Sequence, residues 1–195
     1  MKCLEQSISP EKRQEMEERF YLTNPHTHER RVLKYSLELF DVMADPFCMG
    51  RKKRNLLYYS ALLHDIGYEI SPQKHDVHTY RLITEDPFFD FWPNPERLML
   101  ALVAGGHRKN ICVDINQLPP KQQLAVRQLT SILRIADAID YPRDQSLQLI
   151  GTTLSDEELN ICIKSTACAT VSARVAQKSK LFNEVFNLSV RVTET

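Results

Sequence analysis

The sequence lacks the cysteine pattern of a disulfide scaffold or of a zinc ribbon. Its 195 residues contain five cysteines, an odd number, and no two of them form a Cys-x-x-Cys motif. Disulfide-held secreted domains have paired cysteines, and zinc ribbons have closely spaced ones. The segment from Met1 to Glu18 is charged and polar and has no apolar core of a signal peptide. We therefore expect a reducing compartment and a cytoplasmic protein.

Long apolar runs and an excess of charge of either sign are also lacking. No run approaches the length of about 20 residues that spans a bilayer, and 25 basic residues balance 25 acidic ones. A chain without net charge has no overall field that attracts nucleic acid or an anionic membrane. We expect neither a nucleic-acid polymer nor a membrane as a partner. The sequence shows no internal repeat, and its length suits one domain or one domain with a small appendage.

Helical periodicity dominates the chain up to about residue 141. Ser9 followed by Pro10 is typical of a helix start, and Asp45 followed by Pro46 is typical of a helix end. The predicted helices cover about residues 9–21, 27–45, 51–66, 75–84, 95–105 and 121–141. The last of these has apolar residues around much of its surface, so we expect it to be central.

The pattern changes after Pro142. Apolar and polar residues alternate weakly over residues 146–154, strongly over 159–164 and again over 188–192, which is typical of strands. Residues 169–182 have the pattern of a helix. The sequence therefore predicts a mainly α fold, with a helical domain in residues 1–145 and a small β-β-α-β appendage in residues 146–195.

A histidine and an aspartate, His64 and Asp65, follow an apolar run over residues 56–63. We expect the helix to end at Gly67, because glycine readily adopts the left-handed conformation that closes many helices. A buried Asp65 would need a cation, a metal or several hydrogen-bond donors. Imidazole and carboxylate together are a common ligand set for Zn, Mn or Fe. A salt bridge or a cap at the helix end is the alternative.

Further histidines and an aspartate lie at the edges of predicted apolar helices. They are His28, His75, His107 and Asp137. His28 could instead be a capping residue. Asp137 could instead pair with Arg134, but such a pair contributes only about 0.2–0.5 kcal/mol. That contribution would offset little of the cost of burying a carboxylate, whereas a metal would offset more.

The order of these residues resembles that of HD-domain metal-dependent phosphohydrolases. The segments that carry a closer resemblance are His64–Tyr68, Lys74–His78, Gly106–Lys109 and Leu133–Asp140. They look like the C-terminal HD-type region of exopolyphosphatase and pppGpp phosphohydrolase proteins, and the similarity extends over about residues 27–192. The resemblance implies a helical bundle of the HD-domain type. In those proteins two actin-like lobes carry the phosphatase chemistry, and we expect no counterpart of them here.

The resemblance also implies a site for one or two divalent ions, which could be Mn, Fe, Zn, Co or Mg. The expected ligands of the first ion are His28, His64, Asp65 and Asp137. His75 and His107 would complete a second metal position or contact the substrate, and together with Asp65 they are the candidate catalytic residues. Tyr68 departs from the pattern, because several one-metal HD hydrolases have a catalytic acid near the His-Asp pair.

Three basic residues are candidates to bind the substrate, since guanidinium and ammonium groups suit phosphate oxygens. They are Arg108, Lys109 and Arg143, and each could equally be an ordinary surface cation. We expect a metal-dependent phosphomonoesterase or phosphodiesterase that acts on a small phosphorylated compound such as a nucleotide. The alternative is a weakly active or inactive regulatory module that binds polyphosphate, a nucleotide or a protein. A homodimer is one assembly that the chain could form.

Overall fold

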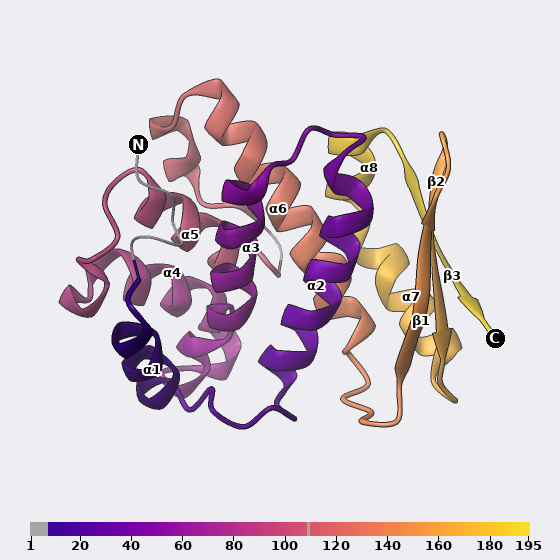
Figure 1. Cartoon of the computed structure of the whole chain (residues 1–195), viewed down its shortest axis with the longest axis horizontal. Helices are drawn as coiled ribbons and strands as arrows, with labels where there is room; N and C mark the ends of the chain where they lie inside the picture. Colours follow the sequence, from indigo (N-terminus) through magenta and orange to yellow (C-terminus); the bar gives the residue numbers. More distant parts are fainter. Residues whose placement is uncertain (1–7, 109) are drawn as a thin grey trace.

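The computed structural model describes residues 8–108 and 110–195. It is mainly helical and has a small three-stranded sheet at the C-terminal end, which confirms the predicted fold class. Figure 1 shows α1, α3, α4 and α5 on one side of the molecule, α2 and α6 in the middle, and the sheet on the other side. Among the described residues, no helix has both the length and the apolar character needed to cross a bilayer.

Within the described residues, six helices and four short 3-10 segments precede the sheet. The helices are α1 (Pro10–Arg19), α2 (His28–Ala44), α3 (Arg51–Leu63), α4 (His75–Glu85), α5 (Glu96–Gly105) and α6 (Pro120–Ile139). The 3-10 segments are η2 (Ile66–Glu69), η3 (Pro72–Lys74), η4 (Pro87–Phe89) and η5 (Val113–Gln117).

Local chemistry sets where the first two helices begin. The Ser9 hydroxyl accepts a hydrogen bond from the Lys12 amide at 3.2 Å, and Pro10 occupies the first helical position. The Thr27 hydroxyl accepts from the Arg30 amide at 3.4 Å in the same way. Both contacts satisfy amides that have no partner within the helix. The Thr27 cap makes His28 the first residue of α2.

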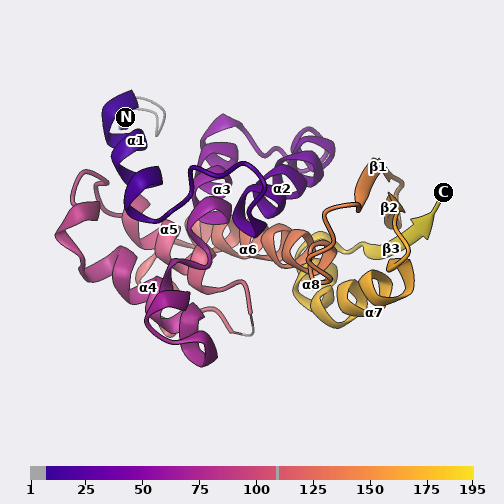
Figure 2. The same ribbon diagram turned by 90° about the horizontal axis from the view of Figure 1, so that it is seen from below.

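Helix α6 is the central element, as its apolar pattern predicts. Most of its residues from Ala125 to Ile139 are buried, and Leu129, Ile132 and Leu133 are fully enclosed. Helices α2, α3, α5, α7 and α8 all pack against it. Figure 2 shows α6 running through the middle of the molecule, between the N-terminal helices and the C-terminal unit. A functional group at the end of α6 can therefore meet groups from both parts of the chain.

The C-terminal unit has the predicted strands and one more helix than predicted. Its elements are β1 (Gln148–Leu154), β2 (Glu158–Lys164), α7 (Cys168–Lys178), α8 (Lys180–Phe186) and β3 (Ser189–Glu194). β2 pairs with β1 in the antiparallel sense and with β3 in the parallel sense. The helix predicted over residues 169–182 is divided at Ser179 into α7 and α8, and both pack against α6. The division of the chain into domains at residue 145 stays a prediction.

The end of α3 differs from the expectation. The helix stops at Leu63, His64 caps it, and the chain continues into η2. No glycine among the described residues has a positive φ, so Gly67 does not close the helix in a left-handed conformation. Its lack of a side chain serves packing instead. A Cβ atom at this position would lie 2.3 Å from the carbonyl oxygen of His75 and 2.4 Å from the amide nitrogen of Thr79.

The substitution Gly67→Ala tests this close approach. We expect it to lower the free energy of unfolding by about 1–3 kcal/mol or more, the usual cost of an overpacked site, because both nearby atoms belong to the backbone of α4. Chemical denaturation measures the change. Gly151→Ala is the matched control, since a Cβ at Gly151 meets nothing within 4 Å. Equal stabilities of the two variants would contradict the packing role of Gly67.

Candidate metal centre

The ends of several helices bring histidine and aspartate side chains together beside α6. His28 and His75 are the first residues of α2 and α4, and His64 caps α3. His107 follows the end of α5, and Asp137 lies in the last turns of α6. The four histidines are at most 8% exposed. Termini of separate helices, rather than one helix face, therefore build the cluster.

One group of side chains surrounds His28 Nε2. This nitrogen lies 3.2 Å from His64 Nε2, 3.3 Å from Asp137 Oδ1 and 3.7 Å from Asp65 Oδ2. The four residues are those expected to share the first ion, and the structure places them side by side. That these four residues bind a metal stays a prediction, and the geometry names the atoms that would face the ion.

A second group surrounds the other oxygen of Asp65. Asp65 Oδ1 lies 3.2 Å from His75 Nε2 and 3.4 Å from His107 Nε2, and the two imidazole nitrogens are 3.0 Å apart. His64 Nε2 lies 3.5 Å from the same oxygen. Asp65 thus lies between the two groups, with Oδ2 toward His28 and Oδ1 toward His64, His75 and His107.

Main-chain hydrogen bonds fix which nitrogen of each imidazole faces the cluster. His64 Nδ1 lies 2.8 Å from the Ala61 carbonyl oxygen, and His75 Nδ1 lies 2.9 Å from that of Pro72. His107 Nδ1 lies 2.7 Å from the carbonyl oxygen of Ala104. A carbonyl only accepts, so each Nδ1 donates its proton. In a neutral imidazole the Nε2 atom is then left with a free lone pair.

This arrangement fits metal ions. In their neutral forms His75 and His107 direct two lone pairs at each other across 3.0 Å, which is repulsive unless a cation lies between them. Ligand atoms at about 2.0–2.2 Å from one ion in a tetrahedral arrangement lie about 3.3–3.6 Å from one another. Most distances in both groups are close to that range. Two sets of buried residues could therefore hold metal: His28, His64 and Asp65, and Asp65, His75 and His107.

Comparison with known protein families relates this chain to a phosphatase family. Residues 12–184 match the family model described as Ppx/GppA phosphatase, domain III. The chain belongs to this family. The match supports the predicted relation to the C-terminal region of exopolyphosphatase and pppGpp phosphohydrolase proteins, whereas membership of the HD-domain superfamily stays a prediction. No curated protein matches the chain.

Asp140 and Arg31 lie behind His28, on the side of its ring that faces away from His64 and Asp65. Asp140 is 1% exposed and its Oδ2 accepts from His28 Nδ1 at 2.6 Å. Arg31 donates to both oxygens of Asp140, at 2.7 and 2.9 Å. A carboxylate behind a histidine is a common support for metal ligands. Arg31 was missed in the sequence, although its position three residues after His28 on one predicted helix was a signal.

Burial and neighbouring charges shift the pKa values of the cluster. Burial opposes a positive charge on His28, but Asp137 and Asp140 raise its pKa to about 9. Burial, together with the nearby His64, lowers the pKa of His107 to about 3. Burial also opposes charge on the carboxyl groups of Asp65 and Asp137, yet the histidines around them lower the pKa of both. The carboxylates of Asp65 and Asp137 are therefore ionised and His107 is neutral, which are the forms that bind metal, whereas His28 must lose a proton to do so.

Two cations approach the centre from residues after α6. Arg143 NH2 lies 3.7 Å from Asp65 Oδ2, and its side chain is 55% exposed. Lys178, in the last turn of α7, lies 3.6 Å from Asp137 Oδ2 and donates to the carbonyl oxygens of His107 and Arg108. Burial lowers the pKa of Lys178, and Asp137 opposes this. The sequence offered no signal for Lys178, because only the fold brings α7 to this point.

The other two candidate substrate contacts have different positions. Arg108 donates to the carbonyl oxygen of Gln73 at 3.0 Å, and its NH1 atom lies 3.9 Å from Asp76. Its side chain is thus engaged with the segment before α4. Lys109 lies outside the residues that the structure describes. The roles of both in substrate binding stay predictions.

The substitution Asp140→Asn tests the support behind His28. We expect metal affinity to fall about 10- to 100-fold, the usual effect of losing such an outer partner, because the neutral amide no longer holds the protonated Nδ1 as strongly. Competition with a chromophoric chelator measures the affinity for Mn or Zn. Asp41→Asn is the control, since Asp41 pairs with Arg54 away from the centre. If both variants bind metal as the wild type does, Asp140 has no such role.

Proposed function

We propose that this domain is a metal-dependent phosphohydrolase of the HD type that cleaves a phosphomonoester or phosphodiester bond in a small compound such as a nucleotide. The observation that carries the proposal is the facing pair of His75 and His107, whose Nδ1 atoms are both engaged with carbonyl groups. The family, which is one of phosphatases, supports an enzyme that acts on phosphate esters or anhydrides.

The proposed ligands divide between two positions. His28, His64, Asp65 and Asp137 would hold one divalent ion. Asp65, His75 and His107 would hold a second. The mixture of imidazole and carboxylate suits Zn, Mn, Fe or Co, and leaves Mg less favoured. When bound, such ions lower the pKa of a water molecule and polarise a phosphoryl oxygen.

The chain's own groups have defined tasks in the hydrolysis. The carbonyl groups of Ala61, Pro72 and Ala104 hold three imidazole rings in one orientation. Arg143, largely exposed and close to Asp65, is placed to bind a phosphate oxygen of the substrate. In the reaction the oxygen of water bonds to phosphorus, the P–O bond to the alcohol breaks, and the alcohol leaves with a proton from water.

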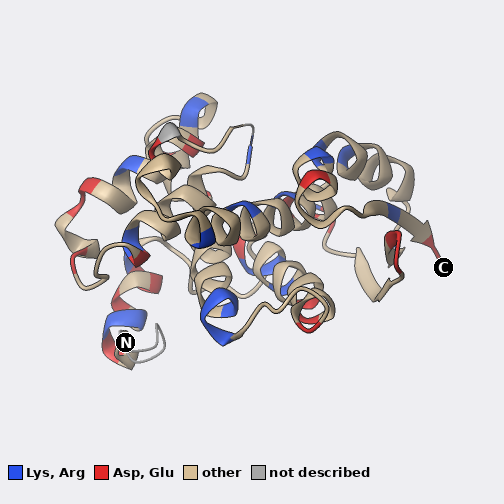
Figure 3. Ribbon diagram, turned by 90° about the horizontal axis from the view of Figure 1, so that it is seen from above, with Lys and Arg blue, Asp and Glu red and all other residues tan. Residues whose placement is uncertain are grey.

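The charge distribution favours a small substrate over a long polyphosphate chain. Figure 3 shows basic and acidic residues interspersed over the helical part and the C-terminal unit. A processive enzyme for a polyanion would need an extended basic track. The exposed cation close to Asp65 is Arg143, which suits a single phosphate group.

Asp65→Asn is the decisive variant for this function. The amide removes the negative charge that both proposed metal positions share, so we expect phosphoester turnover to fall by more than about 100-fold, beyond the usual effect of an outer partner. Steady-state assays with Mn, Co, Ni and Mg measure turnover, and circular dichroism checks the fold. Asp41→Asn serves again as the exposed control and should retain wild-type turnover.

Two results would contradict the proposal. One is full activity of Asp65→Asn. The other is an absence of turnover with every metal across a broad nucleotide and phosphoester panel while the protein binds polyphosphate or a nucleotide tightly. The second result would favour a regulatory module.

Arg143→Asn tests the phosphate contact. Arg143 has a positive φ of 55°, and asparagine tolerates this conformation better than most residues. The substitution thus removes the cation and keeps the backbone. We expect the KM to rise about 10- to 100-fold, as for loss of a charged hydrogen bond. Arg191→Asn on β3 is the control, and an equal effect of both variants on KM would exclude this role.

A further inference from the structure

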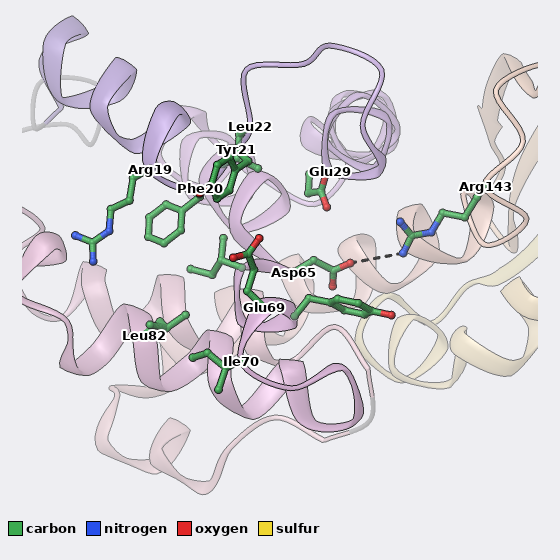
Figure 4. Close-up of a pocket in the computed structure, with 12 residues that line it drawn as sticks. Arg19, Phe20, Tyr21, Leu22, Glu29, Asp65, Glu69, Ile70, Leu82 and Arg143 are labelled. Atoms are coloured by element: carbon green, nitrogen blue, oxygen red, sulfur yellow. Dashed lines mark ion pairs between the residues drawn. The ribbon is translucent and has the colours of Figure 1, made fainter.

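A pocket of about 710 Å³ opens from Asp65. Figure 4 shows Asp65 and Arg143 at one side of it, and Phe20, Ile70 and Leu82 toward the other. Small-molecule sites typically have volumes of about 300–1,000 Å³. The pocket is therefore much larger than a phosphate group needs, and the extra space must suit the rest of the substrate.

The walls beyond Asp65 expose apolar and aromatic side chains to solvent. Tyr21, Tyr68 and Ile70 are 74%, 50% and 55% exposed, and all three line this pocket. The described chain has only a few other large apolar residues that are similarly exposed. The ring of Tyr68 also lies beside that of His75, with 5.3 Å between the ring centres. An exposed aromatic surface is thus continuous with the proposed metal centre.

The charged residues that line the pocket disfavour a substrate that carries a second or third phosphate group. Glu29 and Glu69 line it beyond Asp65. Arg19, at the far end in Figure 4, is paired with Asp86 and lies against the Phe88 ring. Among the described residues that line the pocket, Arg143 is the one cation close to Asp65. A polyphosphate chain would pass carboxylates and apolar groups here, whereas an uncharged group with N–H or O–H donors would find acceptors.

Two lining residues also have backbone conformations that are uncommon without glycine. Tyr21 has a φ of 54° and Arg143 a φ of 55°. Such conformations cost free energy and are concentrated at functional sites. Two of the four such residues in the described chain, Tyr21 and Arg143, line this pocket, and the other two, Cys48 and Asn187, do not.

We propose that the pocket binds the nucleoside part of a nucleoside monophosphate, with its base stacked on Tyr68 and its phosphate at Arg143. This inference rests on the proposed function and names its substrate class. The flat base matches the exposed aromatic surface, and the carboxylates of Glu29 and Glu69 can accept hydrogen bonds from ribose hydroxyl or base amino groups. Inorganic polyphosphate has neither feature and is excluded as the preferred substrate.

Tyr68→Ala tests the stacking contact, with Tyr141→Ala as a matched control. Tyr141 is 53% exposed, close to the value for Tyr68, and does not line the pocket. The assay compares KM for AMP, GMP and glycerol 2-phosphate with the metal-loaded protein. We expect the preference for the nucleotides over glycerol 2-phosphate to fall about 5- to 150-fold in Tyr68→Ala, the range for loss of base stacking, and to stay at the wild-type value in Tyr141→Ala.

Direct binding separates this proposal from the proposed function. Calorimetry with the Mn-loaded protein measures AMP, glycerol 2-phosphate and tripolyphosphate, and Ile70→Ser provides a second pocket variant. If AMP binds and Tyr68→Ala weakens it while no ester is hydrolysed, the pocket assignment stands and the hydrolase assignment falls. If esters are hydrolysed but Tyr68→Ala and Ile70→Ser behave like Tyr141→Ala, or tripolyphosphate binds more tightly than AMP, the pocket assignment is overturned. Absence of AMP binding to the wild type overturns it as well.

Discussion

The hydrogen bond from a histidine Nδ1 to a main-chain carbonyl is the contact on which the centre depends. It occurs at His64, His75 and His107, each time to the residue three positions earlier. The carbonyl groups in the last turn of a helix have no partner within the helix. At the ends of α3 and α5, the histidine that follows supplies this partner and directs its Nε2 atom toward Asp65. The bond that completes the helix therefore also prepares the site.

Much of the fold and of the candidate centre could be predicted from the sequence, because both depend on local signals. Apolar periodicity located the six N-terminal helices, and the alternation after Pro142 located the three strands. The placement of His28 and His107 beside Asp65 followed from the order of the histidines and from the resemblance to a family. Gly67 shows the limit of such signals. Its role depends on the backbone of α4, at His75 and Thr79, and helix-closing preferences carry no information on that contact.

The remaining parts of the centre depend on tertiary contacts that no short pattern describes. Lys178 reaches Asp137 because α7 packs against α6, and the sequence before α7 contains nothing that specifies this. Asp140 contacts two residues that are distant in the sequence, His28 and Arg31, and its burial depends on the packing of α2 against the end of α6. Side chains at helix ends were thus predictable, whereas the charges that neutralise them were not.

The contact of Lys178 with the carbonyl groups of His107 and Arg108 has a consequence for how the C-terminal unit is joined to the centre. Strand β3 packs against α7 and is one helix removed from the histidine cluster. The last turn of α7 contacts that cluster directly, because the ammonium group of Lys178 donates to the backbone at His107. One lysine of the C-terminal unit thus links α7 to the backbone beside His107 and to the carboxylate of Asp137.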